Sequence, residues 1–99
     1  MIRHVVLLRF QDATPPGTLR ALEGAFAALA GQIREVAALE WGTNVSPEGL
    51  AKGYTHCFLL SFALPADRDA YLPHPAHLAF VAQLKPWLAD VLVIDYATA

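Results

Sequence analysis

Residues 2–10 read Ile-Arg-His-Val-Val-Leu-Leu-Arg-Phe, and this stretch predicts the β-strand that decides the fold. It is rich in β-branched and aromatic residues and is too short for a good helix. Successive side chains of a strand point to opposite faces, so the even-numbered residues from Ile2 to Phe10 share one face. Both faces carry aliphatic side chains, which indicates that the strand is covered on both sides.

Three later stretches have the same strand character, namely residues 36–45, 54–62 and 91–96. Two helical regions separate them. The first helix is predicted to begin at Thr14-Pro15, with Thr14 as its N-cap, and to end near Gly31. Its apolar residues recur at helical spacing and form one stripe: Leu19, Leu22, Phe26, Leu29 and Ile33.

The second helical region has two parts. Residues 65–71 fit a short helical turn, and a helix follows from His74-Pro75. We expect that helix to end or kink just before Pro86, because proline has no backbone N–H to donate.

The resulting β-α-β-β-α-β order predicts a ferredoxin-like α+β fold. Its four-stranded antiparallel sheet has the spatial order 4-1-3-2, with both helices on one face. Two helices cannot cover the opposite face, where Val5, Leu7, Cys57 and Leu59 are expected to lie. Because an exposed apolar sheet of that size favours aggregation, we predict a homodimer whose sheets pack face to face as a dimeric α/β barrel.

Composition narrows the class of protein. Residues 1–99 fit a single domain, and a hydrophobic share of 56% with a charged share of 16% excludes disorder. The formal charge of -2 gives no attraction to nucleic acid or to an anionic membrane. The single cysteine, Cys57, cannot form a disulfide within one chain and is expected to be an inert buried thiol near the dimer face. No apolar stretch reads as a signal or a membrane span, so we expect a cytoplasmic protein.

Several short motifs follow one another at a fixed spacing along the chain. They are His4, Trp41-Gly42, Gly53-Tyr54-Thr55-His56, Tyr71-x-x-His74-Pro75-x-His77-x-x-Phe80 and Asp95-Tyr96. In this order the chain resembles the stress-responsive α/β-barrel (Dabb) family over essentially its whole length. The resemblance implies the ferredoxin-like homodimer. The family includes a plant polyketide cyclase that closes a linear poly-β-ketone by intramolecular aldol condensation, without cofactor or metal.

The resemblance also assigns roles by motif position. It implies that His77 is the general base, that Tyr71 holds the substrate carbonyl and that Asp95 orients the base. The positions implied to line the substrate pocket are His4, His56, His74, Phe26 and Phe80. Phe26 stands where the cyclase has a phenol, so this position lacks the hydroxyl that lines the cyclase's pocket.

The chemistry of these residue types fits an aldol closure. Such a closure needs a base that removes a proton next to a carbonyl and a donor that holds the developing oxyanion. Histidine titrates near neutral pH, and a carboxylate on its second nitrogen fixes the tautomer. The alternative is that His77 bonds to Asp95 only to tie helix to sheet. Since the first and fourth strands are antiparallel neighbours, Asp95 is also expected beside His4, which is otherwise a satisfied core histidine.

The spacing of the histidines indicates whether they could share a metal ion. If the first and third strands pair fully, residue 4 lies opposite about residue 60, so His56 lies about 14 Å from His4, too far to share a metal ion. His74 and His77 have the spacing of a metal-binding pair, but no acidic partner follows at a suitable spacing. We therefore predict no metal and no cofactor. His74 also fits a helix start, because it directly precedes Pro75.

Three functions stay open at this point. The first is a small-molecule enzyme or binder with a pocket between the sheet and the helices of each subunit. The second is a non-catalytic, stress-associated dimer in which the histidines are structural. The third is a dimeric-barrel oxygenase-type or haem-handling protein, which the shared architecture alone suggests.

Overall fold

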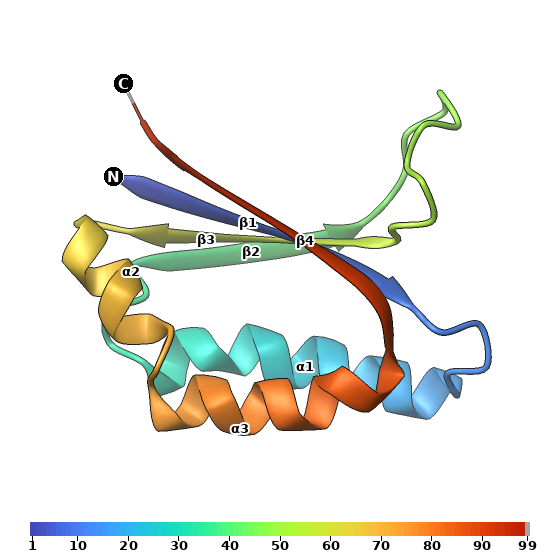
Figure 1. The fold of residues 1–99 in the computed structure, drawn as a ribbon, viewed down its shortest axis with the longest axis horizontal. Helices are drawn as coiled ribbons and strands as arrows, with labels where there is room; N and C mark the ends of the chain where they lie inside the picture. Colours follow the sequence, from blue (N-terminus) through green and yellow to red (C-terminus); the bar gives the residue numbers. More distant parts are fainter. Residues whose placement is uncertain (99) are drawn as a thin grey trace.

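The computed structural model describes residues 1–98 and confirms the ferredoxin-like α+β fold. Its elements are β1 (Ile2–Phe10), α1 (Pro16–Gln32), β2 (Ala38–Thr43), β3 (His56–Phe62), α2 (Pro65–Tyr71), α3 (Pro75–Leu84), a 3-10 turn (Lys85–Trp87) and β4 (Leu88–Ala97). All strand pairs are antiparallel, in the order β2-β3-β1-β4, as predicted. Figure 1 shows α1 and α3 along one face of this sheet, with α2 at one end.

Proline residues set the starts of all three helices. Each helix has a proline in its first positions, where no N–H is needed. The predicted cap of α1 is wrong: Pro15 is the N-cap, and the Thr14 hydroxyl donates instead to the Gln11 carbonyl at 2.6 Å. α3 ends at Leu84, two residues before Pro86, as predicted.

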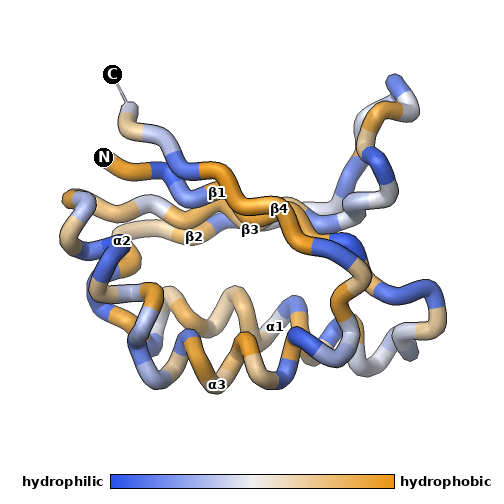
Figure 2. The backbone as a smooth tube through the Cα atoms, viewed as in Figure 1, coloured by the Kyte–Doolittle hydropathy of each residue, from blue (hydrophilic) through white to orange (hydrophobic). Residues whose placement is uncertain are grey.

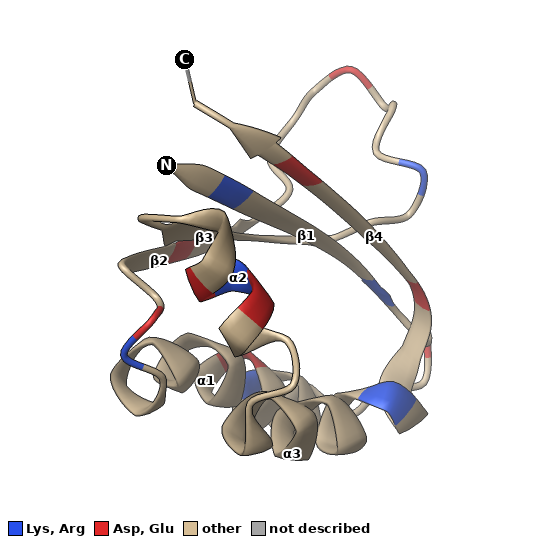
Figure 3. Cartoon of the chain, turned by 60° about the vertical axis from the view of Figure 1, so that its left-hand side comes forward, with Lys and Arg blue, Asp and Glu red and all other residues tan. Residues whose placement is uncertain are grey.

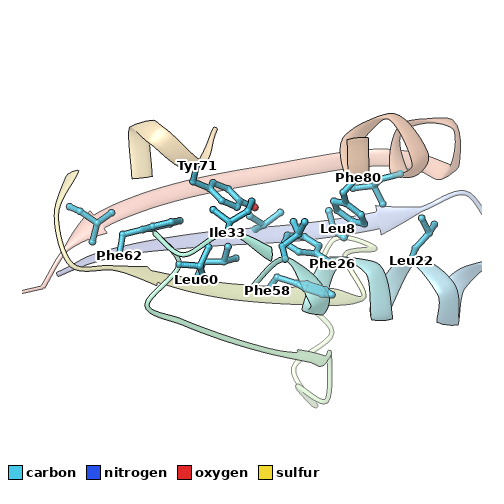
Figure 4. Close-up of a cluster of buried hydrophobic side chains, with 14 residues drawn as sticks. Leu8, Leu22, Phe26, Ile33, Phe58, Leu60, Phe62, Tyr71 and Phe80 are labelled. Carbon is cyan, nitrogen blue, oxygen red and sulfur yellow. The ribbon is translucent and has the colours of Figure 1, made fainter. Parts of the chain in front are cut away.

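The core lies between the helices and the even-numbered face of β1. Ile2, Val6 and Leu8 on that face are buried. They meet the predicted stripe of α1 and the inward side chains of β3, and the buried apolar cluster includes Leu22, Phe26, Leu29, Ile33, Phe58, Leu60, Phe62, Tyr71 and Phe80. Figure 4 shows these side chains gathered in one cluster, with Tyr71 among them.

The opposite face of the sheet is apolar and uncovered in the single chain. Val5 pairs with Ile94 and Leu7 with Leu92 across β1 and β4. Ile94 is 56% exposed and Leu92 40% exposed, and Figure 2 shows apolar colouring along both strands. Cys57 is exposed here, so its predicted burial is wrong for the single chain, because no helix covers this side. Among the helices formed by residues 1–98, none combines the length and the apolar character of a membrane-crossing segment.

Candidate functional site

A histidine–carboxylate pair lies on the helix-facing side of the sheet, at its β4 edge. His4 and Asp95 are direct partners across β1 and β4, as the strand order predicts. His4 Nδ1 lies 2.6 Å from Asp95 Oδ1, and His4 is only 5% exposed. Because Nδ1 is engaged with the carboxylate, Nε2 is the ring nitrogen left for other partners.

Asp95 is shared between His4 and Arg68 of α2. Its second oxygen, Oδ2, accepts from Arg68 Nη1 at 2.8 Å, and Arg68 Nε donates to Asp69 Oδ1 at 2.8 Å. Partial burial alone raises the pKa of Asp95, but the hydrogen bonds from Arg68 and His4 outweigh it and lower that pKa. Asp95 is therefore ionised at neutral pH. Figure 3 shows the basic residue between two acidic ones on α2.

The predicted contact between His77 and Asp95 does not form. His77 Nδ1 lies 2.8 Å from the carbonyl oxygen of Leu72 instead, while Asp95 is engaged by His4 and Arg68. A carbonyl oxygen can only accept, so Nδ1 carries a proton, and in the neutral imidazole the free lone pair is on Nε2. The tautomer that a general base needs is thus set by the backbone, and the expected orienting role of Asp95 toward His77 is corrected.

Tyr71 packs against both the His77 and the His4 imidazole. Its ring centroid is 4.4 Å from that of His77 and 5.9 Å from that of His4. Tyr71 is fully buried, and its hydroxyl has no hydrogen-bond partner among residues 1–98. Burial raises the pKa of Tyr71 far above its ordinary value, so the phenol stays protonated and can donate.

His56 belongs to a second histidine–carboxylate pair at the other end of β3. It lies opposite Leu8, whereas His4 lies opposite Leu60, so the predicted separation of the two histidines is confirmed in register. His56 Nε2 is 2.7 Å from Glu23 Oε2, and Nδ1 is 2.7 Å from Thr55 Oγ1. Both nitrogens are engaged within the chain, so His56 ties α1 to β3, and its substrate-binding role stays a prediction.

The other implied pocket residues have local roles in the fold. His74 Nδ1 accepts from the backbone N–H of Ala76 at 3.0 Å, which makes His74 the N-cap of α3. The Phe26 ring lies 4.0 Å from that of Phe58 and 4.8 Å from that of Phe80, so both implied aromatics are core residues. Their contact with a substrate stays a prediction. No group of three or more His, Cys, Asp or Glu among residues 1–98 is placed to hold a metal ion.

Two surface hollows each include one predicted pocket residue, His56 in the first and Phe80 in the second. A hollow of about 620 Å³ opens on the uncovered sheet face, where Leu7, Cys57, Leu59 and Leu92 contribute to its walls. A smaller one of about 230 Å³ lies between α1 and α3. Neither is lined by Tyr71 or His77, because buried side chains surround the phenol.

Comparison with known proteins identifies the family. A model described as the stress responsive A/B barrel domain, Dabb, matches residues 2–98. The chain belongs to the Dabb family. The stress-response A/B barrel domain-containing protein HS1 of Arabidopsis thaliana is 38% identical to this Dabb domain over 95 residues, which are 96% of this chain and 87% of HS1. Olivetolic acid cyclase of Cannabis sativa is 24% identical over 95 residues, covering 96% of this chain and 94% of the cyclase.

Solved structures agree with the Dabb fold. The crystal structure of At3g17210 from Arabidopsis thaliana matches this Dabb domain with a TM-score of 0.94 at 36% identity, over 100% of this chain and 96% of the other. A dimeric ferredoxin-like protein of unknown function from Thermobifida fusca matches with a TM-score of 0.83 at 26% identity, over 98% and 90% of the two chains. The family and the fold expected from the motifs are therefore confirmed.

Sequence reasoning missed three partners in this Dabb domain. Arg68 belongs to none of the motifs in the sequence, yet it binds Asp95. The available signal was its position three residues before Tyr71, which places both side chains on one face of α2. Glu23 directly follows Leu22 of the predicted stripe, and the Leu72 carbonyl left no sequence signal at all.

Proposed function

We propose that this Dabb domain catalyses cofactor-free proton transfer at a carbon next to a carbonyl group, with aldol ring closure of an uncharged β-keto compound as the reaction. The observation that carries the proposal is the buried Tyr71 hydroxyl, which lacks a partner among residues 1–98 and adjoins the His77 ring. The similar protein from Cannabis sativa is named olivetolic acid cyclase, and a cyclase activity is consistent with this chemistry.

The reaction can be written with the groups of the site. His77 Nε2 removes a proton from the carbon between two carbonyl groups, and the electron pair moves onto one carbonyl oxygen. The Tyr71 hydroxyl donates a hydrogen bond to that oxyanion. The enolate carbon then attacks a second carbonyl carbon of the same molecule and forms the new C–C bond. The resulting alkoxide takes the proton back from His77, which restores the base.

Each catalytic group is in a suitable state for its step. The Leu72 carbonyl holds His77 in the tautomer with Nε2 free, and burial keeps the Tyr71 phenol neutral. Asp95 acts as a positioning residue through His4, not through His77. We assign substrate contacts to His4, His56, His74, Phe26 and Phe80 as the family motif implies. Arg68 is already paired with two carboxylates, so its charge is not free for an anionic substrate.

We further propose that the functional unit is a homodimer. The uncovered face carries Val5, Leu7, Leu92 and Ile94, and burying exposed apolar area drives association. The hollow of about 620 Å³ lies on that face, where a second copy would fill it. The similar protein from Thermobifida fusca is described as dimeric, which supports this assembly.

An isotope-exchange experiment tests the catalytic proposal. The probe is benzoylacetone, an uncharged β-diketone, incubated in D₂O, and proton NMR follows the loss of its central C–H signal above the buffer rate. We expect His77→Gln to lower the enzyme-dependent rate by about 100-fold or more, and Tyr71→Phe to lower it by about 100-fold. The matched control is Arg20→Gln, an exposed change on α1 that should leave the rate intact.

The competing function is a non-catalytic dimer. An exchange rate equal to that of buffer for the wild-type protein overturns the catalytic proposal in favour of structural histidines. Wild-type exchange that survives in His77→Gln removes His77 from the base role.

A further inference from the structure

We infer that Arg68 is a positioning residue that holds the Asp95 carboxylate against His4 and that its positive charge disfavours a proton on the His4 imidazole. None of the family motifs includes Arg68. The contact chain runs Asp69–Arg68–Asp95–His4, and each of its three links is a hydrogen bond of 2.8 Å or less. The inference deepens the proposed function and rests on it only for its catalytic consequence.

The geometry depends on one face of α2. Arg68 and Tyr71 are three residues apart, so this seven-residue helix presents both from the same side. Arg68 reaches the carboxylate behind the His4 ring, while Tyr71 packs edge-on against that ring with centroids 5.9 Å apart. A single short helix thus fixes His4 from two directions. The Arg68 side chain is 25% exposed, so part of its charge is shielded from water.

The charges around His4 decide its protonation state. The titratable or charged groups packed near it are Asp95 on β4, Arg68 and Tyr71 on α2 and, behind Tyr71, His77 on α3. A lone carboxylate would favour the imidazolium. The Arg68 guanidinium on the second oxygen offsets the charge of that carboxylate and repels a proton on His4, whereas the Asp69 carboxylate offsets part of the Arg68 charge. Arg68 therefore favours the uncharged ring.

An uncharged His4 has a defined preference among substrates. Its Nδ1–H is given to Asp95, so Nε2 is a hydrogen-bond acceptor. An acceptor fits the hydroxyl group of an enolised ketone and does not attract a carboxylate. If the proposed function holds, His4 receives the enol hydroxyl while Tyr71 donates to the neighbouring oxygen, which names the enol form of a β-keto compound as the ligand.

Histidine NMR tests the inference without any substrate. The ring Cε1–H signals of the four histidines are assigned with single His→Gln variants and followed against pH in the wild type, Arg68→Gln and Asp69→Asn. We expect the pH midpoint of the His4 signals to rise by about half to one pH unit in Arg68→Gln. It should fall, by a smaller amount, in Asp69→Asn, because that change frees the Arg68 charge. Arg68→Lys should stay close to the wild type.

The His56 signals are the internal control, because His56 pairs with Glu23 at the other end of the sheet. An unchanged His4 midpoint in Arg68→Gln overturns the inference, as does an equal shift of His4 and His56. Asp69→Asn changes an exposed side chain and keeps the test available if Arg68→Gln does not fold. Isotope exchange and histidine titration are separate measurements. If the catalytic proposal fails, the change of the His4 midpoint still tests the role of Arg68.

Discussion

Replacing Tyr71 by Phe should make this Dabb domain more stable while it removes the proposed oxyanion donor. The Tyr71 hydroxyl is buried without a partner among residues 1–98, and such a group costs about 1–3 kcal/mol. Phe keeps the ring contacts with Phe62 and His77, whose centroids lie 5.2 Å and 4.4 Å away. The variant therefore loses the penalty and little packing.

The magnitude can be read as a melting temperature. For a domain of this size, each kcal/mol corresponds to about 4–8 °C, so Tyr71→Phe should melt at least about 4 °C above the wild type. Differential scanning calorimetry at one fixed protein concentration is the assay, because the proposed dimer would have a concentration-dependent melting temperature.

Tyr54→Phe is the matched control. The Tyr54 hydroxyl donates to Asp90 Oδ2 at 2.7 Å, so its removal deletes a formed hydrogen bond and should not raise the melting temperature. If Tyr71→Phe melts at or below the wild-type temperature, the Tyr71 hydroxyl is satisfied in the folded protein. The reasoning that reserves this hydroxyl for a ligand would then be refuted.

Three other changes test separate parts of the structure. The pKa of Asp95 is lowered in the folded chain, so its stabilising effect is present above the unfolded pKa of about 3.9 and is lost as pH falls through the folded pKa. Urea unfolding should therefore show that the wild type loses its stability advantage over Asp95→Asn below about pH 4. A constant difference in unfolding free energy from pH 7 to pH 3 would contradict this. Glu23→Ala leaves buried His56 without its acceptor and should lower the free energy of unfolding by about 1–3 kcal/mol. Glu23→Gln keeps an acceptor and should lower it less. Equal losses of the two variants in denaturant titrations would count against the His56–Glu23 hydrogen bond. Ile94→Glu puts a carboxylate on the uncovered face and should shift the sedimentation coefficient toward that of the monomer. Val93→Glu, on the helix-facing side of β4, should not shift it. A wild type that sediments as a monomer would contradict the dimer proposal.

Alternation and helical spacing were sufficient to predict the fold. The even-numbered face of β1 and the stripe of α1 are buried because apolar side chains at periods of 2 and 3.6 have only one way to meet. The ends of the strands were less predictable. β4 begins at Leu88, not at 91, because its pairing with β1 continues through an irregularity near Arg9 and Phe10. Such pairing depends on the partner strand and leaves no local signal.

The site was predictable where strand register decides it and not where a short helix does. Adjacent strands placed Asp95 beside His4, as expected. The partner of His77 depends on where α2 ends, because the carbonyls at a helix C-terminus lack helical partners. Leu72 is the C-cap of α2, so its carbonyl is free to accept from His77. No residue pattern in the sequence indicates that the Leu72 carbonyl, and not Asp95, would accept from His77.

The first histidine of the site and its carboxylate stand 91 positions apart in the chain. β1 is synthesised first and β4 last among the described elements. The apolar strand β1 therefore has neither of its neighbours, β3 and β4, until most of the polypeptide has emerged from the ribosome. Folding dominated by such distant pairings is slow. A chain interrupted within β4 before Asp95 would still hold the segments of β1, β2 and β3 but would lack the carboxylate that pairs with His4.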